Sequence, residues 1–272
     1  MNAIMNASSL IAGLVVAAAA MSSHAQAADH EALRDLSSRI QFASYAGEVR
    51  ELQRDIAGLQ RLELEGEPAI LQKYYVSFGQ LKLADLLRHK ERGDARKFAG
   101  ECSKMSGGTA GMEAKRGSST RERNRVARLN AELWALQAAC SGLEAELSLV
   151  PGSTSVSLAS FRSSSAGGKA LAAAPNNPRV KLLVAIQEAR RADDANEWRS
   201  AQEKLQQVMS AFDAEPPSED GMPDWGQADA LAWLGYIHLQ AGDKVQARNA
   251  LERALVLASD YAWARELLKQ VR

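Results

Sequence analysis

Cysteine, aromatic residues and an excess of charge of one sign are all scarce in this sequence. Only two of the 272 residues are cysteine, and aromatic side chains make up 6%. The formal net charge is zero, which argues against nucleic acid or an anionic membrane as partner, because binding to either needs a basic excess. Long alternating runs of β-branched residues are also missing. Leucine and alanine dominate instead, so the sequence predicts an all-α fold.

Motifs that carry chemistry are missing too. The sequence contains no Gly-x-Ser-x-Gly, His-Glu-x-x-His or Cys-x-x-Cys, so a serine hydrolase, a zinc enzyme and a dithiol redox site lack their reacting groups. The stretch 106–120 is rich in glycine but lacks the Lys-Ser ending of a phosphate-binding loop. The adjacent carboxylates Asp193 and Asp194 lie at a predicted turn, where helix capping is their expected role. We therefore expect no catalytic residue, no metal site and no cofactor, and a protein that is not an enzyme.

Residues 1–27 resemble a secretory signal peptide. An apolar core runs from Leu10 to Met21, and a small-x-small cleavage site ends at Ala27. The segment before the core has no lysine or arginine, which departs from the usual pattern. A membrane anchor is the alternative, but the apolar core is short for a bilayer span. The expected location is the periplasm or the outside of the cell, with no membrane span after cleavage.

The stretch 228–261 carries the strongest pattern in the chain. Its first helix is expected to end around Gly242, because glycine tolerates the left-handed conformation that closes a helix. Asp243 can then cap the N–H groups of a second helix. Gly235 and Ala247 are small where the two helices are expected to cross, which allows their axes to approach closely.

The same stretch resembles a tetratricopeptide repeat. Numbered from Ala228 over 34 positions, it has small and large apolar residues where that repeat has them, namely Leu234, Gly235, Ala247, Leu251 and Ala254. Leu231, His238 and Ser259 depart from the family, which commonly has tryptophan, tyrosine and proline at these positions. None of these departures alters the expected fold.

The resemblance implies a right-handed α-solenoid of antiparallel helix pairs. One domain over 28–272 is expected, closed by a capping helix at 262–272. Degenerate helix pairs are expected before the clear repeat, at about 29–64, 68–105, 121–148 and 179–212. As a whole, and most strongly after Pro175, the chain resembles exported bacterial tetratricopeptide proteins that share no known activity. This resemblance implies a binding role.

Three connecting segments are expected to be irregular. They are rich in glycine, serine or proline and cover 106–120, 150–169 and 215–226, with at most one short helical turn around Leu158. Gly47 is expected to mark a turn between two helices. One long helix is the alternative, but a glycine in a helix interior costs about 1 kcal/mol.

The first helix of each pair lines the concave face of a tetratricopeptide array, as the resemblance implies. The candidate binding residues are polar and aromatic side chains of such helices, namely Asp229, Trp233, Tyr236, Gln240, Tyr74 and Tyr75. Rigid aromatic side chains are the kind that anchor binding partners. For these aromatic residues, packing in the core remains an open alternative.

Three functions are consistent with this sequence. The first is a periplasmic scaffold or adaptor that binds a protein or peptide segment in the concave groove. The second is a small-molecule or glycan binder, which would be favoured if Trp225, Trp233 and the tyrosines converged on one exposed pocket. The least favoured is an envelope hydrolase with its site in the loops at 106–120 and 213–226.

Two residue types leave their roles open. Cys102 and Cys140 lie on different predicted helices, and in an oxidising compartment they can form a disulfide. Two buried thiols that serve as small apolar residues are the alternative. His238 is expected to be a packed helix residue and not a metal ligand.

Overall fold

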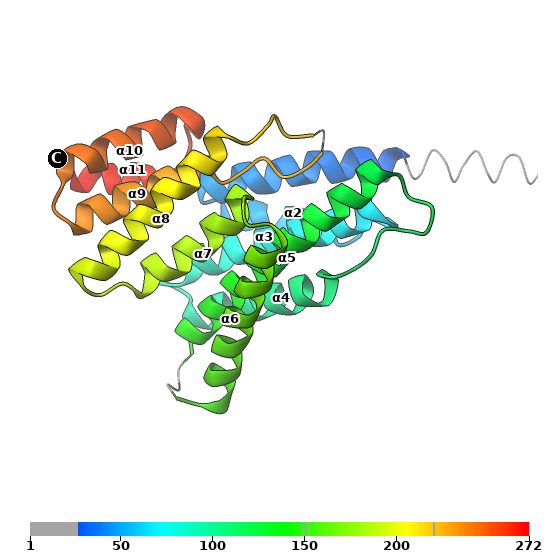
Figure 1. Ribbon diagram of the computed structural model, residues 1–272, viewed down its shortest axis with the longest axis horizontal. Coiled ribbons are helices and arrows are strands. Elements are labelled where there is room, and N and C mark those ends of the chain that lie inside the picture. The colour runs from blue at the N-terminus through cyan, green and yellow to red at the C-terminus, as the bar shows by residue number, and fades with distance from the viewer. Residues whose placement is uncertain (1–26, 149, 151, 220, 272) are drawn as a thin grey trace, which may run out of the picture.

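The computed structural model describes residues 27–148, 150, 152–219 and 221–271, and every regular element within these ranges is an α-helix (Figure 1). The first described helix covers residues 27–46. The later helices are α2 (Val49–Leu59), α3 (Glu67–Leu87), α4 (Arg92–Thr109), α5 (Thr120–Glu146), α6 (Thr154–Ala173), α7 (Pro178–Arg191), α8 (Ala195–Asp213), α9 (Gln227–Gln240), α10 (Lys244–Leu257) and α11 (Ala262–Gln270). The predicted all-α class is thereby confirmed. The expected signal peptide, 1–27, lies almost entirely outside the described residues.

Helices that follow one another in the chain pack together along most of its length. From α2 to α11, each helix contacts the next one. A second set of contacts joins α3 to α5, α5 to α7, α7 to α9 and α9 to α11. These five helices therefore form a continuous row, which we call the inner row, and α4, α6, α8 and α10 pack beside it. None of the helices described is both long enough and apolar enough to cross a lipid bilayer.

Side chains at the helix starts explain where several helices begin. Ser119, Asn177, Asp194 and Asp243 precede α5, α7, α8 and α10, and each accepts a hydrogen bond from a backbone N–H of the first turn. These bonds satisfy donors that would otherwise lack a partner in the helix. The predicted capping by Asp243 is confirmed, as is the predicted left-handed Gly242, whose φ is 76°. Asp194 has the capping role expected of it.

The crossing of α9 and α10 follows the prediction made from its small residues. A Cβ added to Gly235 would lie 2.5 Å from Leu251 Cγ and 3.4 Å from the Ala247 carbonyl oxygen. Ala247 itself is fully buried. Only glycine allows the two helices to approach this closely at Gly235.

The expectation of an irregular connection over 150–169 is wrong, because α6 runs through most of it. Its buried face consists of small residues, namely Ala159, Ser163, Ala166, Gly167 and Ala170. This face lies directly against α5, where Ser163 Oγ donates to the Ala138 carbonyl oxygen at 2.9 Å. Serine and glycine have low helix propensity, so tertiary packing against α5 explains why the segment is helical.

Two further boundaries differ from those expected. Helix α4 extends to Thr109, so the irregular part of 106–120 is shorter than expected. The expected helix pair at 121–148 is one helix, α5, and its partner is α6. In Figure 1, α6 and the end of α5 project away from the other helices. The turn at Gly47 is confirmed, with a φ of 75° between two helices.

The first described helix and α11 meet, although they lie at opposite ends of the described chain. The rings of Tyr45 and Tyr261 have centroids 4.8 Å apart. The Tyr45 hydroxyl also donates to Asp229 of α9 at 2.9 Å. In an open solenoid each repeat contacts only its neighbours. Here the end of the first described helix also contacts the start of α11 and α9, so helices far apart in the chain lie side by side.

A disulfide joins α4 to α5 through Cys102 and Cys140. The two Cα atoms are 5.9 Å apart, and both residues are fully buried. The bond closes a loop across the glycine-rich segment 110–119 and fixes α4 against the inner row.

Candidate functional site

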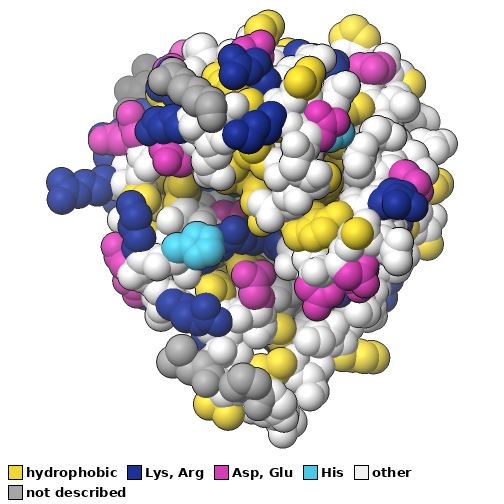
Figure 2. Space-filling model, turned by 90° about the vertical axis from the view of Figure 1, so that its left-hand side faces the viewer, with side chains coloured by type: hydrophobic (Ala, Val, Ile, Leu, Met, Phe, Trp, Pro, Cys, Tyr) yellow, Lys and Arg dark blue, Asp and Glu magenta, His cyan; other side chains and the backbone are white. Residues whose placement is uncertain are grey.

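The inner row encloses a pocket of about 420 Å³. Side chains of α3, α5, α7, α9 and α11 line it, together with Ser44 of the first described helix and Trp225 from the segment before α9. Figure 2 shows one face of the molecule with a hollow near its middle, around which hydrophobic, basic and acidic side chains and a histidine lie. Because helices from every part of the described chain contribute, the pocket depends on the whole fold.

Asp229 forms the polar centre of the pocket floor. It lies in the first turn of α9 and is only 2% exposed. Its carboxylate accepts hydrogen bonds from the hydroxyls of Tyr45 and Tyr261, at 2.9 and 3.0 Å, and from Lys82 Nζ at 2.5 Å. Burial and the Asp229 charge raise the pKa of both tyrosines well above the usual value, so both remain donors.

Aromatic rings make up much of the pocket wall. The ring centroids of Trp233 and Trp263 are 5.0 Å apart, and those of Tyr261 and Trp263 are 6.2 Å apart. Trp225 packs on Phe78 with centroids 4.5 Å apart. Trp263 is half-buried and the other two tryptophans are buried. A wall of this kind favours the flat apolar part of a ligand.

Arg190 enters the pocket from the end of α7. It pairs with Asp85 of α3, and its guanidinium carbon lies 5.3 Å from the centroid of the Trp233 ring. Its Nη1 is 4.0 Å from a carboxylate oxygen of Glu146 and has no hydrogen-bond partner in the described part of the chain. Arg190 therefore keeps one buried donor unused.

Two more basic residues, Arg88 and His89, stand at the pocket mouth. Arg88 Nε donates to His89 Nε2 at 2.9 Å. Burial and the positive charge of Arg190 lower the pKa of the Arg88 guanidinium. Partial desolvation and the Arg88 charge lower the pKa of the His89 imidazole as well. The neutral histidine ring can then accept the hydrogen bond from Arg88.

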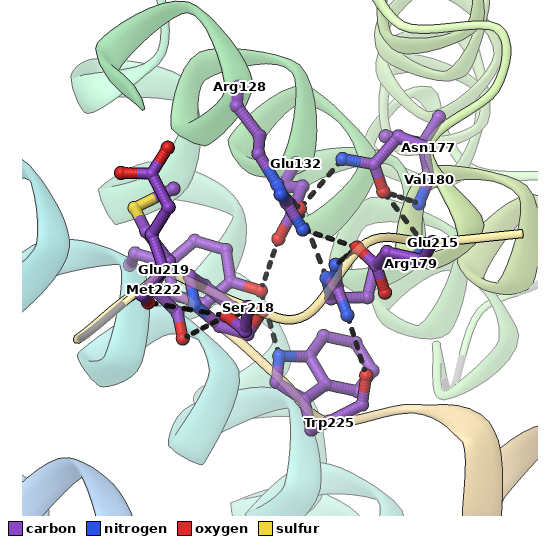
Figure 3. A network of polar contacts seen from close by, with 12 residues as sticks. Arg128, Glu132, Asn177, Arg179, Val180, Glu215, Ser218, Glu219, Met222 and Trp225 are labelled. Carbon is purple, nitrogen blue, oxygen red and sulfur yellow. Dashed lines mark hydrogen bonds and ion pairs between the residues drawn. The ribbon is translucent and has the colours of Figure 1, made fainter. Parts of the chain in front are cut away.

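Behind the pocket lies a network of buried charges, shown in Figure 3. Glu132 of α5 is fully buried and accepts from the Tyr74 hydroxyl at 2.8 Å and from Arg179 Nε at 3.1 Å. Arg179 also pairs with Glu215 and donates to the Trp225 carbonyl oxygen at 3.1 Å. Burial lowers the pKa of the Arg179 guanidinium, but the neighbouring acidic residues raise it by more.

This network supports one wall of the pocket. The Trp225 indole Nε1 donates to the Tyr74 hydroxyl at 2.8 Å, while the same tryptophan lines the pocket. Glu215 and Trp225 both belong to the segment between α8 and α9. The network therefore fixes that segment, and with it the position of Trp225.

Only some of the six residues expected to line a groove lie at the pocket. Asp229 and Trp233 line the pocket. Tyr236 is half-buried and packs against Trp233 with ring centroids 5.6 Å apart. Gln240 is exposed and does not line the pocket.

Tyr74 and Tyr75 are buried in the core, which was the alternative left open for them. The pocket also contains residues that the sequence did not single out, namely Lys82, Asp85, Arg88, Arg190 and Trp263. The sequence did contain one sign that Lys82 belongs to the site. Lys82 stands between Leu81 and Leu83, which are both buried, so its charged side chain interrupts an apolar part of α3.

A cluster of three carboxylates has the spacing needed for a metal ion, within the ranges described. Asp193, Asp194 and Glu197 lie close together, and all three are exposed. Asp194 caps α8, and Glu197 accepts from the backbone N–H of Asp193 at 3.0 Å. These bonds give Asp194 and Glu197 a structural role at the start of α8.

No protein-family model matches the chain, and no curated protein matches it either. The resemblance to a tetratricopeptide repeat therefore depends on the residue pattern of 228–261 and its neighbours.

Proposed function

We propose that the chain is an exported, non-catalytic binding protein of the tetratricopeptide type, and that its inner-row pocket takes a small organic molecule. The observation that carries this proposal is the convergence of Trp225, Trp233, Tyr261 and Trp263 on one pocket. The pocket volume of about 420 Å³ lies within the range of roughly 300–1,000 Å³ that is usual for small-molecule sites.

A small molecule fits this geometry better than an extended peptide. A peptide in a concave groove needs an open channel along several repeats. Here the contact between Tyr45 and Tyr261 joins the two ends of the described chain beside the pocket. Of the six residues expected to line a groove, only Asp229 and Trp233 line the pocket.

The proposal can be tested with a neutral apolar fluorophore, N-phenyl-1-naphthylamine, and the purified protein. We expect saturable binding of one fluorophore per chain, seen as increased emission. Ile186 lines the pocket from α7 and is half-buried, so Ile186→Trp should fill the space and abolish this binding. The matched control is Leu158→Trp, because Leu158 is exposed on α6 and does not line the pocket.

Circular dichroism of both variants is the control for folding, and we expect both to keep the helical content of the unmodified protein. Absence of binding, or binding that survives Ile186→Trp, would exclude this pocket as a small-molecule site. Native mass spectrometry of protein purified from its own host adds a second measurement. A co-purifying small mass that Ile186→Trp removes supports the proposal, whereas a co-purifying peptide that it removes supports the peptide-binding scaffold expected from the sequence.

A further inference from the structure

The charges that line the pocket do not balance. Its basic residues are Lys82, Arg88, Lys90 and Arg190, and its carboxylates are Asp85, Asp229 and Glu266. Two of the cations have partners inside the pocket, since Lys82 pairs with Asp229 and Arg190 pairs with Asp85. The third carboxylate, Glu266, pairs with Lys269 of its own helix. Arg88 and Lys90 therefore have no carboxylate partner among the residues that line the pocket.

Arg88 differs from an ordinary surface arginine in its surroundings. It is half-buried, and among the described residues no carboxylate lies within ion-pair distance of it. Its one hydrogen bond goes to His89, which is uncharged when it accepts. Burial and the Arg190 charge lower the pKa of Arg88, while the more distant Asp85 and Glu146 raise it by less. A partly desolvated cation whose nearest carboxylates lie beyond ion-pair distance is incompletely compensated, and a bound anion would relieve that cost.

We propose that the pocket takes an organic anion with a flat apolar body. This inference rests on the binding function proposed above and names the chemical class of its ligand. Arg88, with Lys90 beside it, binds the carboxylate, sulfonate or phosphate group at the pocket mouth. Trp263 and Trp233 receive the apolar body. The guanidinium carbon of Arg190, whose Nη1 is an unused donor, lies 5.3 Å from the centroid of the Trp233 ring. Guanidinium groups suit this role because they bind planar oxyanions through two parallel hydrogen bonds.

The decisive test compares two ligands of nearly the same shape, 2-naphthoate and the neutral 2-naphthamide. Isothermal titration calorimetry with the purified protein measures the dissociation constant of each. We expect 2-naphthoate to bind about tenfold tighter or more, which is the range for a hydrogen bond to a charged group. Added salt should weaken the binding of 2-naphthoate and leave that of 2-naphthamide unchanged.

Variants assign the preference to the pocket mouth. Arg88→Gln should reduce the preference for the anion to roughly twofold or less. Lys90→Gln should reduce it partly, and because Lys90 is exposed this variant tests the proposal even if Arg88→Gln fails to fold. Arg116→Gln is the matched control, since Arg116 is exposed, does not line the pocket and carries the same charge.

The outcomes separate this inference from the binding function itself. Equal affinity for the two ligands, or a preference that survives both Arg88→Gln and Lys90→Gln, overturns the anion inference and leaves the small-molecule site intact. If neither naphthalene ligand binds and the neutral fluorophore does not bind either, the proposed small-molecule binding function is overturned as well. Binding of the fluorophore without binding of either naphthalene ligand overturns only the ligand class.

Discussion

Glu132 illustrates how single residues in this protein combine burial with charge. Its carboxylate is inaccessible to solvent and accepts hydrogen bonds from Tyr74, Arg128, Asn177 and Arg179. A buried carboxylate is tolerated only when its charge is balanced and its oxygens have donors, and Glu132 meets both conditions. Glu132 and the arginines around it therefore compensate one another's buried charge, and the loss of either leaves the other without one of its partners.

Replacement of Glu132 by glutamine should destabilise the protein strongly. Glutamine keeps the shape but removes the negative charge, so the buried Arg179 loses one of its two acidic partners. We expect the free energy of unfolding to fall by about 3–5 kcal/mol, the usual cost of breaking a buried pair. Urea denaturation measures it. Glu203→Gln, on the exposed surface of α8, should change stability by less than about 0.5 kcal/mol. A similar loss in both variants would contradict the role given to Glu132.

The buried tyrosines predict a loss of stability in alkali. Burial and nearby carboxylates raise the pKa of Tyr45, Tyr74 and Tyr261 well above the usual value. The folded state thus favours the neutral phenol, while the unfolded chain ionises near pH 10. This part of the stability is complete below about pH 10 and is lost as the pH rises further. Urea denaturation at a series of pH values should show the decline, and the absorbance of tyrosinate from these residues should rise only with unfolding.

The residue pattern could predict little of the candidate site. Asp229 and Trp233 were identified because they lie on the first helix of the stretch that resembles a tetratricopeptide repeat, and that helix, α9, belongs to the inner row. Arg88 and Arg190 could not be identified in the same way. They come from the ends of α3 and α7, 102 positions apart, and only the packing of the inner row brings both to one pocket.

At the scale of helices, the sequence predicted the packing best where two helices cross so closely that only a small residue fits between them. Gly235→Ala should lower the free energy of unfolding by about 1–3 kcal/mol, because the new methyl group would overlap Leu251. Gly168→Ala is the control. Gly168 is exposed in α6, and a methyl group there would have no heavy atom within 4 Å, so alanine should stabilise by about 0.5–1 kcal/mol. Thermal unfolding compares the two, and a gain in stability for Gly235→Ala would contradict the close crossing of α9 and α10.

Helix α6 shows where the same reasoning fails. Its sequence is rich in serine and glycine, residues that favour turns when they are exposed. The same small side chains allow α6 to lie close against α5, with a hypothetical Gly167 Cβ only 3.7 Å from Ala138 Cβ. Local propensity and tertiary packing thus point in opposite directions, and packing decides the outcome.

At the scale of the whole molecule, the inner row combines two kinds of contact. Contacts between successive helices of the row are those expected of a repeat array. The contacts of Asp229 with Tyr45, Lys82 and Tyr261 are different, because they tie the first described helix and α3 to α9 and the start of α11. The repeat pattern could predict the first kind and not the second. The enclosed pocket exists because both are present.

This view predicts that a single hydroxyl near one end of the chain stabilises the other end. Tyr45→Phe removes one donor to the buried Asp229 carboxylate and leaves the ring contact with Tyr261 in place. We expect a loss of about 1.5–3 kcal/mol and faster amide exchange in both the first described helix and α11. Tyr236→Phe is the matched control, since the Tyr236 hydroxyl makes no hydrogen bond within the described ranges. Hydrogen exchange read by mass spectrometry distinguishes the cases. Faster exchange confined to the first helix would mean that Asp229 packs the two ends separately, whereas faster exchange at both ends means that it joins them into one cooperative unit around the pocket.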